Sequence, residues 1–217
     1  MSYIAFFDLD NTILKINSGE ALLRRAHKNG VLSIRKLITA YYLAILYKLK
    51  IIDPARIIEK LAAWLTKFPV SDIESLCHEI VEKDLIPAIR PQIIDEIKRH
   101  KEQGANLVIL SSALASICFP LAKHLEMHSV ICSELEELNQ HYTGLPKGMF
   151  CFKEEKLNRM NQYLDTNKYA CEDSYYYGDS IDDLPVLQSV GYPVCVNPDK
   201  SLEKIAQERN WVIHTWD

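Results

Sequence analysis

The sequence predicts an α/β fold, in which a parallel sheet is covered by helices and a helical segment is inserted after the first strand. Short apolar runs rich in β-branched or aromatic residues alternate with segments of helical periodicity, and one long helical segment interrupts this alternation near the N-terminus. Strands that alternate with helices form parallel sheets covered on both faces. Ligands bind outside the carboxyl ends of such strands, so we expect a functional site at that edge.

Six apolar runs have the length and composition of buried strands. They cover residues 3–7, 106–110, 129–132, 174–177, 193–196 and 211–214. Helical periodicity covers residues 92–103, 114–125, 154–164, 184–189 and 201–209. We expect these segments to form a core domain made of residues 1–14 and 91–217.

Residues 15–90 break the alternation, because their pattern is helical nearly throughout. Two pairs, Asp53-Pro54 and Phe68-Pro69, interrupt the segment, and proline at these points favours helix boundaries. Because the segment follows the first strand directly, we expect a helical cap domain that lies over the carboxyl edge of the sheet.

Within the predicted cap, residues 31–52 are strongly apolar, but charged residues leave only residues 37–47 uncharged. A helix that crosses a membrane needs about 20 apolar residues, so we predict no integral membrane segment. An amphipathic helix packed within the cap is the favoured interpretation. A helix that lies on a bilayer surface is the alternative.

The composition narrows the partners and the compartment. The chain of 217 residues carries 25 Lys and Arg against 29 Asp and Glu, and the net charge of -4 argues against a nucleic-acid partner. The six cysteines lie singly, without zinc-site spacing, and Asp8 and Asp10 interrupt the apolar run that a signal peptide would need. We therefore expect a cytoplasmic protein with reduced thiols, and its oligomeric state is left open.

Acidic side chains follow two of the predicted strands. Asp8 and Asp10 come after the first strand, and Asp179, Asp182 and Asp183 come after residues 174–177. Carboxylates that converge without a counter-charge repel one another, and burial disfavours their charged forms. A hard divalent cation with oxygen ligands removes this difficulty, and magnesium suits carboxylates that also face a substrate phosphate. The sequence therefore predicts a Mg2+ site.

Two aspartates spaced two residues apart after a strand suit phosphoryl transfer in two steps. One carboxylate can form an aspartyl-phosphate, while the other protonates the leaving alcohol and then activates water. The transferred group spreads negative charge over three oxygens, so the site also needs donors and a fixed cation. Ser111 and Lys156 are candidates for these roles.

Four motifs give the chain a resemblance to the haloacid dehalogenase-like (HAD) superfamily, subfamily IB, the branch that resembles phosphoserine phosphatase. The first motif, Asp-x-Asp-x-Thr, stands at residues 8–12 as DLDNT. The second, an apolar strand that ends in Ser or Thr, is similar to LVILS at residues 107–111, with Ser112 as the alternative. The third, a lysine that opens a helix, resembles Lys156, and the fourth is GDSIDD at residues 178–183.

The resemblance implies a Rossmann-like core with a cap that opens and closes, and a role for each motif residue. Asp8 would be the nucleophile and Asp10 the general acid and base. The backbone from Leu9 to Thr12, with Ser111 and Lys156, would bind phosphate. Mg2+ would be held by Asp8, the backbone carbonyl of Asp10 and Asp179, with Asp183 supporting or completing the metal shell.

Alternatives remain for several of these residues. Ser111 alone could simply cap the next helix, and Lys153 is the rival of Lys156. Asp182 could support a neighbouring residue of the site or be the N-cap of a helix from Leu184 onward, and the N-cap is the safer interpretation.

The chain departs from the family pattern at a position that affects which substrate it can bind. Phosphoserine phosphatases resemble one another in a Glu nine residues after the nucleophile, which receives the substrate amine. Here Asn17 occupies that position, and Glu20 lies three residues further on. A neutral amide cannot pair with an ammonium group as a carboxylate does, so phosphoserine is disfavoured.

We expect a phosphatase of a small phosphomonoester. The alternatives are a sugar-phosphate mutase, a catalytically silent HAD-like domain that binds a phosphorylated ligand or a protein, and a phosphatase of a lipid phosphate at a membrane surface.

Overall fold

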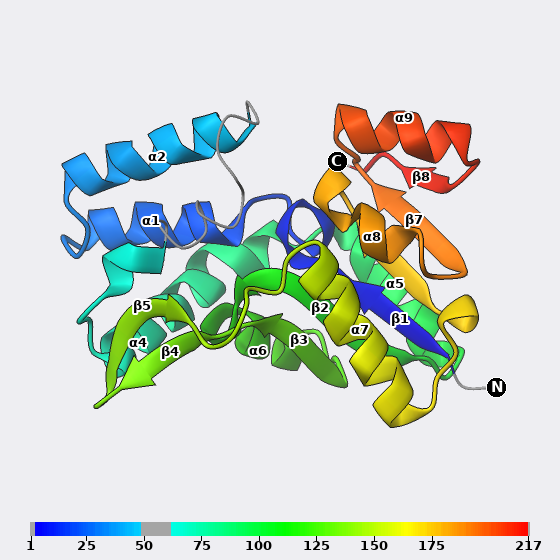
Figure 1. Ribbon diagram of the computed structural model, residues 1–217, viewed down its shortest axis with the longest axis horizontal. Coiled ribbons are helices and arrows are strands. Elements are labelled where there is room, and N and C mark those ends of the chain that lie inside the picture. Colours follow the sequence, from blue (N-terminus) through cyan, green and yellow to red (C-terminus); the bar gives the residue numbers. More distant parts are fainter. Residues whose placement is uncertain (1–2, 49–61, 217) are drawn as a thin grey trace.

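A parallel sheet forms the centre of the molecule, as predicted (Figure 1). The computed structural model describes residues 3–48 and 62–216. Six strands pair in the order β3-β2-β1-β6-β7-β8, and every pairing is parallel. Their bounds are β1 (Ile4–Phe7), β2 (Asn106–Leu114), β3 (Ser129–Ser133), β6 (Tyr175–Gly178), β7 (Tyr192–Val196) and β8 (Val212–His214). The α/β class is therefore confirmed, and β1 lies in the middle of the sheet.

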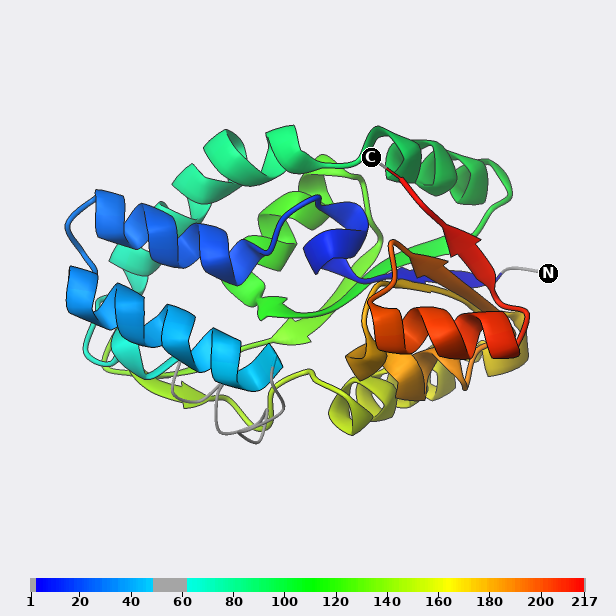
Figure 2. The same ribbon diagram turned by 90° about the horizontal axis from the view of Figure 1, so that it is seen from above.

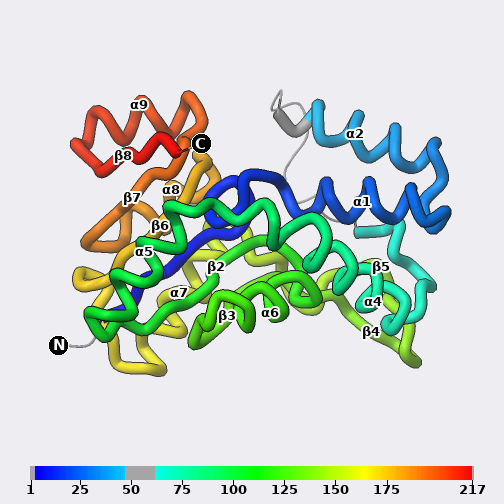
Figure 3. The backbone as a smooth tube through the Cα atoms, turned by 180° about the vertical axis from the view of Figure 1, so that it is seen from behind, coloured from blue at the N-terminus to red at the C-terminus, as the bar shows by residue number. Residues whose placement is uncertain are grey.

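Helices cover both faces of this sheet. Alternate residues of β1 point to opposite faces, so they pack against different helices. Ala5 and Phe7 belong to a hydrophobic cluster with α5 (Pro91–Glu102) and α6 (Ala115–His124). Ile4 and Phe6 belong to a second cluster with α7 (Glu154–Asn167), α8 (Leu184–Leu187) and α9 (Lys200–Glu208). Figure 3 shows α5 and α6 on the face that is turned away in Figure 1.

The segment after β1 is helical, as predicted. It contains α1 (Ser18–Lys28), α2 (Ile34–Lys48), a 3-10 turn (Ala63–Leu65), α4 (Val70–Ile80), a π-helical turn (Val81–Leu85) and a second 3-10 turn (Ile86–Ala88). Pro69 precedes α4 as its N-cap residue, whereas Asp53-Pro54 lies outside the described residues. Figure 2 shows α1 and α2 side by side at one end of the molecule.

Two extended connections join this helical segment to the sheet. Leu14 forms an antiparallel bridge with Ile89, and the N–H of Arg90 donates to the carbonyl of Ile13 at 2.9 Å. The paired residues Leu14 and Ile89 lie next to the predicted limits of the cap, residues 15 and 90. The division into two domains stays a prediction.

One element was not predicted, a hairpin of β4 (Leu135–Leu138) and β5 (His141–Pro146). It contacts the helical segment, because His141 forms a bridge with Pro69 and the N–H of Val70 donates to the carbonyl of Gln140 at 3.0 Å. The two turn residues, Asn139 and Gln140, both have positive φ, of 51° and 63°. Two positive φ values fit a tight hairpin turn, but Asn-Gln lacks the glycine that usually signals one.

The second strand is longer than predicted. β2 continues past Leu110 to Leu114, with a shift of register against β3 in this stretch. Ser111 and Ser112 therefore lie within the strand and not after it. They still lie beyond Ile109, the last residue of β2 that pairs with β1, so they reach the carboxyl edge next to Asp8.

The described part of the chain contains no helix with the length and apolar character required to cross a membrane. The apolar segment predicted at residues 31–52 forms α2 over Ile34–Lys48, and its last four residues lie outside the described ranges.

Candidate active site

The nucleophile candidate, Asp8, is the first residue after β1. Its N–H donates to the carbonyl of Tyr177 at 2.9 Å, and its own carbonyl accepts from the N–H of Ile13 at 3.3 Å. The chain then turns sharply through Leu9–Ile13, where Asn11 has a φ of 56°. Asp8 is 7% exposed. The turn thus holds both aspartates of the first motif at the carboxyl edge of the sheet.

Three of the predicted metal ligands meet at this edge. Asp8, Asp179 and Asp183 each offer a carboxylate oxygen, and these oxygens all lie within 4.8 Å of one another. They come from the ends of β1 and β6 and from the turn that follows β6. Thr12 is fully buried, and its hydroxyl lies 3.5 Å from a carboxylate oxygen of Asp179, which links the first and fourth motifs.

Lys156, in the first turn of α7, lies between two of these acids. Its Nζ donates to Oδ1 of Asp8 at 3.0 Å and to Oδ1 of Asp183 at 2.6 Å, and the residue is 3% exposed. The rival Lys153 lies elsewhere, with its Nζ at 3.3 Å from Oδ1 of Asp182. Of the two lysines, Lys156 is therefore the one in contact with Asp8.

Burial and mutual repulsion disfavour the ionised forms of the acids in this cluster. Burial, followed by the charges of Asp183 and Asp10, raises the pKa of Asp8 to about 7 although Lys156 opposes the shift. Burial and the charges of Asp183 and Asp8 raise the pKa of Asp179 to about 9. Burial alone would lower the pKa of Lys156, but the carboxylates of Asp183 and Asp8 outweigh it and raise that pKa. One lysine is too little positive charge for three acids.

The same cluster fits a divalent cation. Oδ1 of Asp183 accepts from Lys156 and from the hydroxyl of Tyr176 at 2.7 Å, whereas its Oδ2 is buried and has no hydrogen-bond partner within the described ranges. A buried carboxylate oxygen without a partner is costly. Three converging carboxylates are also the hard oxygen donors that Mg2+ prefers. The residues present therefore suit the predicted metal.

The hydrogen bonds of Asp10 go to the start of α1 and not to the three-acid cluster. Its carboxylate accepts from the N–H of Ser18 at 2.8 Å and from the side-chain amide of Asn17 at 2.9 Å. Burial raises the pKa of Asp10, while the N–H of Ser18 lowers it part of the way. These bonds tie Asp10 to the N-terminus of α1 in the helical segment. Its predicted metal contact, through the backbone carbonyl, stays a prediction.

The second motif is less clearly connected to the cluster. Ser111 is fully buried, and its hydroxyl oxygen accepts from the N–H of Ala113 at 3.3 Å. No hydrogen bond joins it to the acidic cluster in the part of the chain that the structure describes. Nor does it cap α6, whose N-cap residue is Leu114. Ser112 is half-buried, and phosphate binding by either serine stays a prediction.

The reading of Asp182 as a helix cap is wrong. Asp183 is the residue before α8, and it forms no capping hydrogen bond through its side chain. Asp182 instead pairs with Lys153, and its own N–H donates to the hydroxyl of Ser180. The physical reason is that residues 181–183 form a separate 3-10 turn, which places Asp182 ahead of the helix start.

Three residues that shape the site had no predicted role in it. Tyr176 was predicted only to be part of a strand, but its hydroxyl donates to Asp183. Asn17 was noted only for the absent carboxylate, yet it contacts Asp10. Asp199 accepts from the N–H of Ile181 at 2.7 Å and also caps α9, so it anchors the turn of the fourth motif. An Asp immediately before a helix was the available signal for Asp199.

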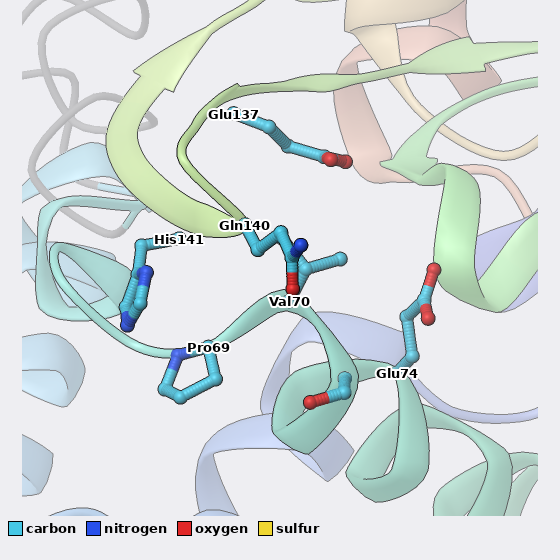
Figure 4. Close-up of a pocket in the computed structure, with 7 residues that line it drawn as sticks. Pro69, Val70, Glu74, Glu137, Gln140 and His141 are labelled. Carbon is cyan, nitrogen blue, oxygen red and sulfur yellow. The ribbon is translucent and has the colours of Figure 1, made fainter.

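A hollow of about 310 Å³ lies elsewhere, between α4 and the β4–β5 hairpin (Figure 4). Its walls include Pro69, Val70, Gln140 and His141, with Glu74 and Glu137 on different sides. None of the predicted site residues lines it. Two carboxylates would repel a phosphate, so this hollow does not compete with the acidic cluster as the reaction site.

Comparison with known proteins gives a family. A family model described as haloacid dehalogenase-like hydrolase matches residues 5–188, which confirms the resemblance drawn from the four motifs. The histidinol-phosphatase of Neisseria meningitidis serogroup C is 29% identical over 220 residues, and the match covers 98% of each chain.

Solved structures agree on the fold. A protein of unknown function from Bordetella pertussis Tohama I has a TM-score of 0.91 at 24% identity, over 99% of each chain. A phospho-aspartyl intermediate analogue of phosphoserine phosphatase has a TM-score of 0.76 at 15% identity, over 100% of this chain and 95% of the other. At these identities the likeness concerns the fold alone.

Proposed function

We propose that this chain, which belongs to the haloacid dehalogenase-like hydrolase family, hydrolyses a small phosphomonoester with Mg2+ through an aspartyl-phosphate on Asp8. That it is a phosphatase follows from the family together with its phosphatase relatives. The observation that supports the mechanism is that Asp8 contacts Lys156 and has a carboxylate oxygen within 4.8 Å of those of Asp179 and Asp183.

In the first step, the carboxylate of Asp8 attacks phosphorus, and the bond from phosphorus to the ester oxygen breaks. Asp10 gives its proton to the departing alcohol. A raised pKa suits this role, because more of Asp10 is then protonated near neutral pH. Lys156 holds a positive charge beside Asp8 and offsets the negative charge on the phosphoryl oxygens.

In the second step, water attacks the phosphorus of the aspartyl-phosphate. Asp10 now accepts a proton from that water, and the carboxylate of Asp8 is the leaving group. Inorganic phosphate forms, and Asp8 and Asp10 return to their starting states. Asp10 gives a proton in the first step and takes one back in the second, while Asp8 carries the phosphoryl group. This division of roles requires two acids in the motif.

Asp8, Asp179 and Asp183 would hold the Mg2+ ion, with the backbone carbonyl of Asp10. When bound, the ion supplies positive charge that favours the ionised carboxylates and the transferred phosphoryl group. Tyr176 and Lys156 orient Asp183 through its other oxygen.

The helical segment would act as the cap. Ser18, at the start of α1, donates to Asp10, so α1 closes directly over the acid and base. Asp8 is almost fully covered, and we infer that the cap opens to admit substrate and closes to exclude water during phosphoryl transfer. The connections at Leu14 and Ile89 are the candidates for the hinge.

For the substrate, we propose a small phosphate ester, with histidinol phosphate as a candidate to be tried before phosphoserine. The relative named histidinol-phosphatase matches over nearly the whole of both chains. Asn17 is engaged with Asp10 and with the N–H of Glu20, and it offers no carboxylate to an amine. We further propose a cytoplasmic location and no nucleic-acid partner.

The test is a phosphatase screen over a panel of phosphorylated metabolites that includes both esters, with free phosphate as readout. We expect release with Mg2+, none with EDTA, and none from Asp8→Asn. Asp173→Asn, at an exposed carboxylate, is the matched control and should retain full activity.

The same screen separates the alternatives. Undiminished turnover by Asp8→Asn, or with EDTA, would contradict the mechanism. A folded wild type that binds phosphate esters but releases no phosphate from any of them would favour the silent domain. Isomerised sugar phosphate without release would indicate a mutase.

A further inference from the structure

Helix α2 carries a stripe of large apolar side chains that are open to solvent. Ile34, Ile38, Tyr42 and Ile45 are 52%, 61%, 59% and 55% exposed. Their spacing of four, four and three residues places them along one side of a helix. The stripe extends about 16 Å at 1.5 Å per residue. We refer to these four side chains as the α2 stripe.

The charge around the α2 stripe is one-sided. Residues 18–48, from the start of α1 to the end of α2, contain six Lys or Arg (24, 25, 28, 35, 36 and 48) and one acid, Glu20, for a net charge of +5. The whole chain is -4, so the remaining residues sum to -9. The single acid is already engaged, because it accepts from Arg24 and from the hydroxyl of Tyr41.

Three of the basic side chains are available to an outside partner. Lys28, Arg35 and Lys36 are exposed, and none has an ion-pair partner among residues 3–48 and 62–216. Arg35 follows Ile34 and lies two helical turns before Tyr42, on nearly the same side of the helix. Positive charge therefore borders the α2 stripe.

The position of α2 leaves the stripe accessible. α2 packs on α1, and Arg24 of α1 donates to the hydroxyl of Tyr41 of α2 at 3.0 Å. α2 lies at the outer edge of the molecule (Figures 1 and 2). α1 separates it from the sheet, so the α2 stripe does not belong to the core.

We propose that the α1–α2 hairpin docks on the surface of an anionic phospholipid bilayer, with the α2 stripe inserted at the interface. Apolar side chains bordered by Lys and Arg are what such helices present to anionic lipid. The 15 described residues of α2 are fewer than the about 20 needed to cross a bilayer, so these residues would lie in the plane of the bilayer. A second copy is a poorer occupant, because the exposed Lys28, Arg35 and Lys36 of two hairpins would repel one another.

The proposed docking has a consequence for the active site. The N-terminus of α1 bonds to Asp10, so the element that would meet the bilayer is the one that covers the general acid. The proposal itself does not depend on catalysis, because it concerns binding by a surface that contains no site residue.

Vesicle sedimentation tests the docking with the full chain. We expect the wild type to sediment with mixed phosphatidylcholine–phosphatidylglycerol vesicles, to stay in solution with pure phosphatidylcholine, and to be released as salt increases. Ile38→Glu combined with Tyr42→Glu should weaken binding by about tenfold or more, because it places charge on the inserted side. Ile94→Glu, at a 48% exposed apolar residue of α5, is the matched control and should bind like the wild type.

A charge variant gives a second arm. Arg35→Glu combined with Lys36→Glu should also weaken binding by about tenfold or more. Lys98→Glu combined with Lys204→Glu, at exposed lysines of α5 and α9, should not. Hydrolysis of a soluble aryl phosphate without vesicles should be unchanged in all four variants.

Three outcomes would overturn the proposal. One is no sedimentation of the wild type with anionic vesicles, and another is equal loss in the matched controls. The third is a dimer in light scattering that Ile38→Glu with Tyr42→Glu dissociates, because the α2 stripe would then be an interface between copies.

Discussion

At the scale of single residues, Asn17 both caps helix α1 and contacts Asp10, the proposed general acid. Its carbonyl oxygen accepts from the N–H of Glu20 and caps α1, while its amide donates to Oδ2 of Asp10 at 2.9 Å. An acid at this position would repel Asp10. The amide at position 17 can therefore donate to Asp10, the proposed general acid.

The two functions of Asn17 can be separated by substitution. Asn17→Ser keeps a good helix cap, so the free energy of unfolding should change by only a few tenths of a kcal/mol. It removes the donor to Asp10, and we expect kcat to fall about tenfold because a hydrogen bond to a charged group is lost. Thermal unfolding and steady-state kinetics on an aryl phosphate measure the two effects, and an unchanged kcat would refute the role.

Gly178 is the other residue whose identity follows from the site. A Cβ added there would lie 2.8 Å from Oδ2 of Asp183 and 2.8 Å from a ring carbon of Tyr176. Only glycine leaves room for Asp183 to approach the end of β6. The first residue of the fourth motif is therefore explained by packing.

Gly178→Ala should displace Asp183 from the cluster. We expect a loss of about 1–3 kcal/mol in the free energy of unfolding, from overpacking. We also expect a smaller rise in melting temperature on addition of Mg2+ than in the wild type. A magnesium-dependent rise equal to that of the wild type would show that Asp183 is not needed for the ion.

At the scale of elements, α5 meets the sheet through a buried polar cluster on the face opposite to Lys156. His100 is fully buried, with its Nε2 at 2.8 Å from the hydroxyl of Tyr177 and its Nδ1 at 2.8 Å from that of Tyr3. Glu96 accepts from Tyr177 and Arg99. Burial, followed by the charge of Arg99, lowers the pKa of His100 from 6.5 to about 4.

This cluster predicts a loss of stability in acid. In the unfolded chain His100 takes up a proton near pH 6.5, whereas in the folded protein it does so only near pH 4. The stabilisation is therefore complete above pH 6.5 and is lost as the pH falls toward 4, by about 3 kcal/mol.

His100→Gln should flatten the dependence of unfolding free energy on pH between these limits, although it lowers stability overall. Urea unfolding at a series of pH values measures the slope. His124→Gln, at an exposed histidine of α6, is the matched control. A slope in His100→Gln equal to that of the wild type would contradict the assignment.

At the scale of the whole molecule, the fold and the acidic cluster were predictable because they depend on local patterns. The apolar run before Asp8 and the alternation of strand and helix predicted a parallel sheet, whose carboxyl edge gathers Asp8, Asp179 and Asp183. Lys156 came from the family resemblance, and its two hydrogen bonds support the choice over Lys153.

What was not predictable depends on contacts between distant segments. The β4–β5 hairpin contains exposed polar residues and a turn without glycine, and its position depends on pairing with residues near Pro69. The bond from Tyr176 to Asp183 depends on which face of β6 the ring occupies, and a run of three tyrosines does not reveal this. The length of β2 follows from its pairing with β3 beyond the end of β1.

The central claim is that Asp8 itself carries the phosphoryl group. The most direct measurement is an acid quench during turnover, followed by borohydride reduction and mass spectrometry of the peptide that contains residues 8 and 10. An acyl phosphate on aspartate is reduced to homoserine, so we predict homoserine at position 8, none at position 10, and none without substrate. Homoserine at position 10, or a quenched enzyme with rapid turnover and an unmodified Asp8, would contradict the account.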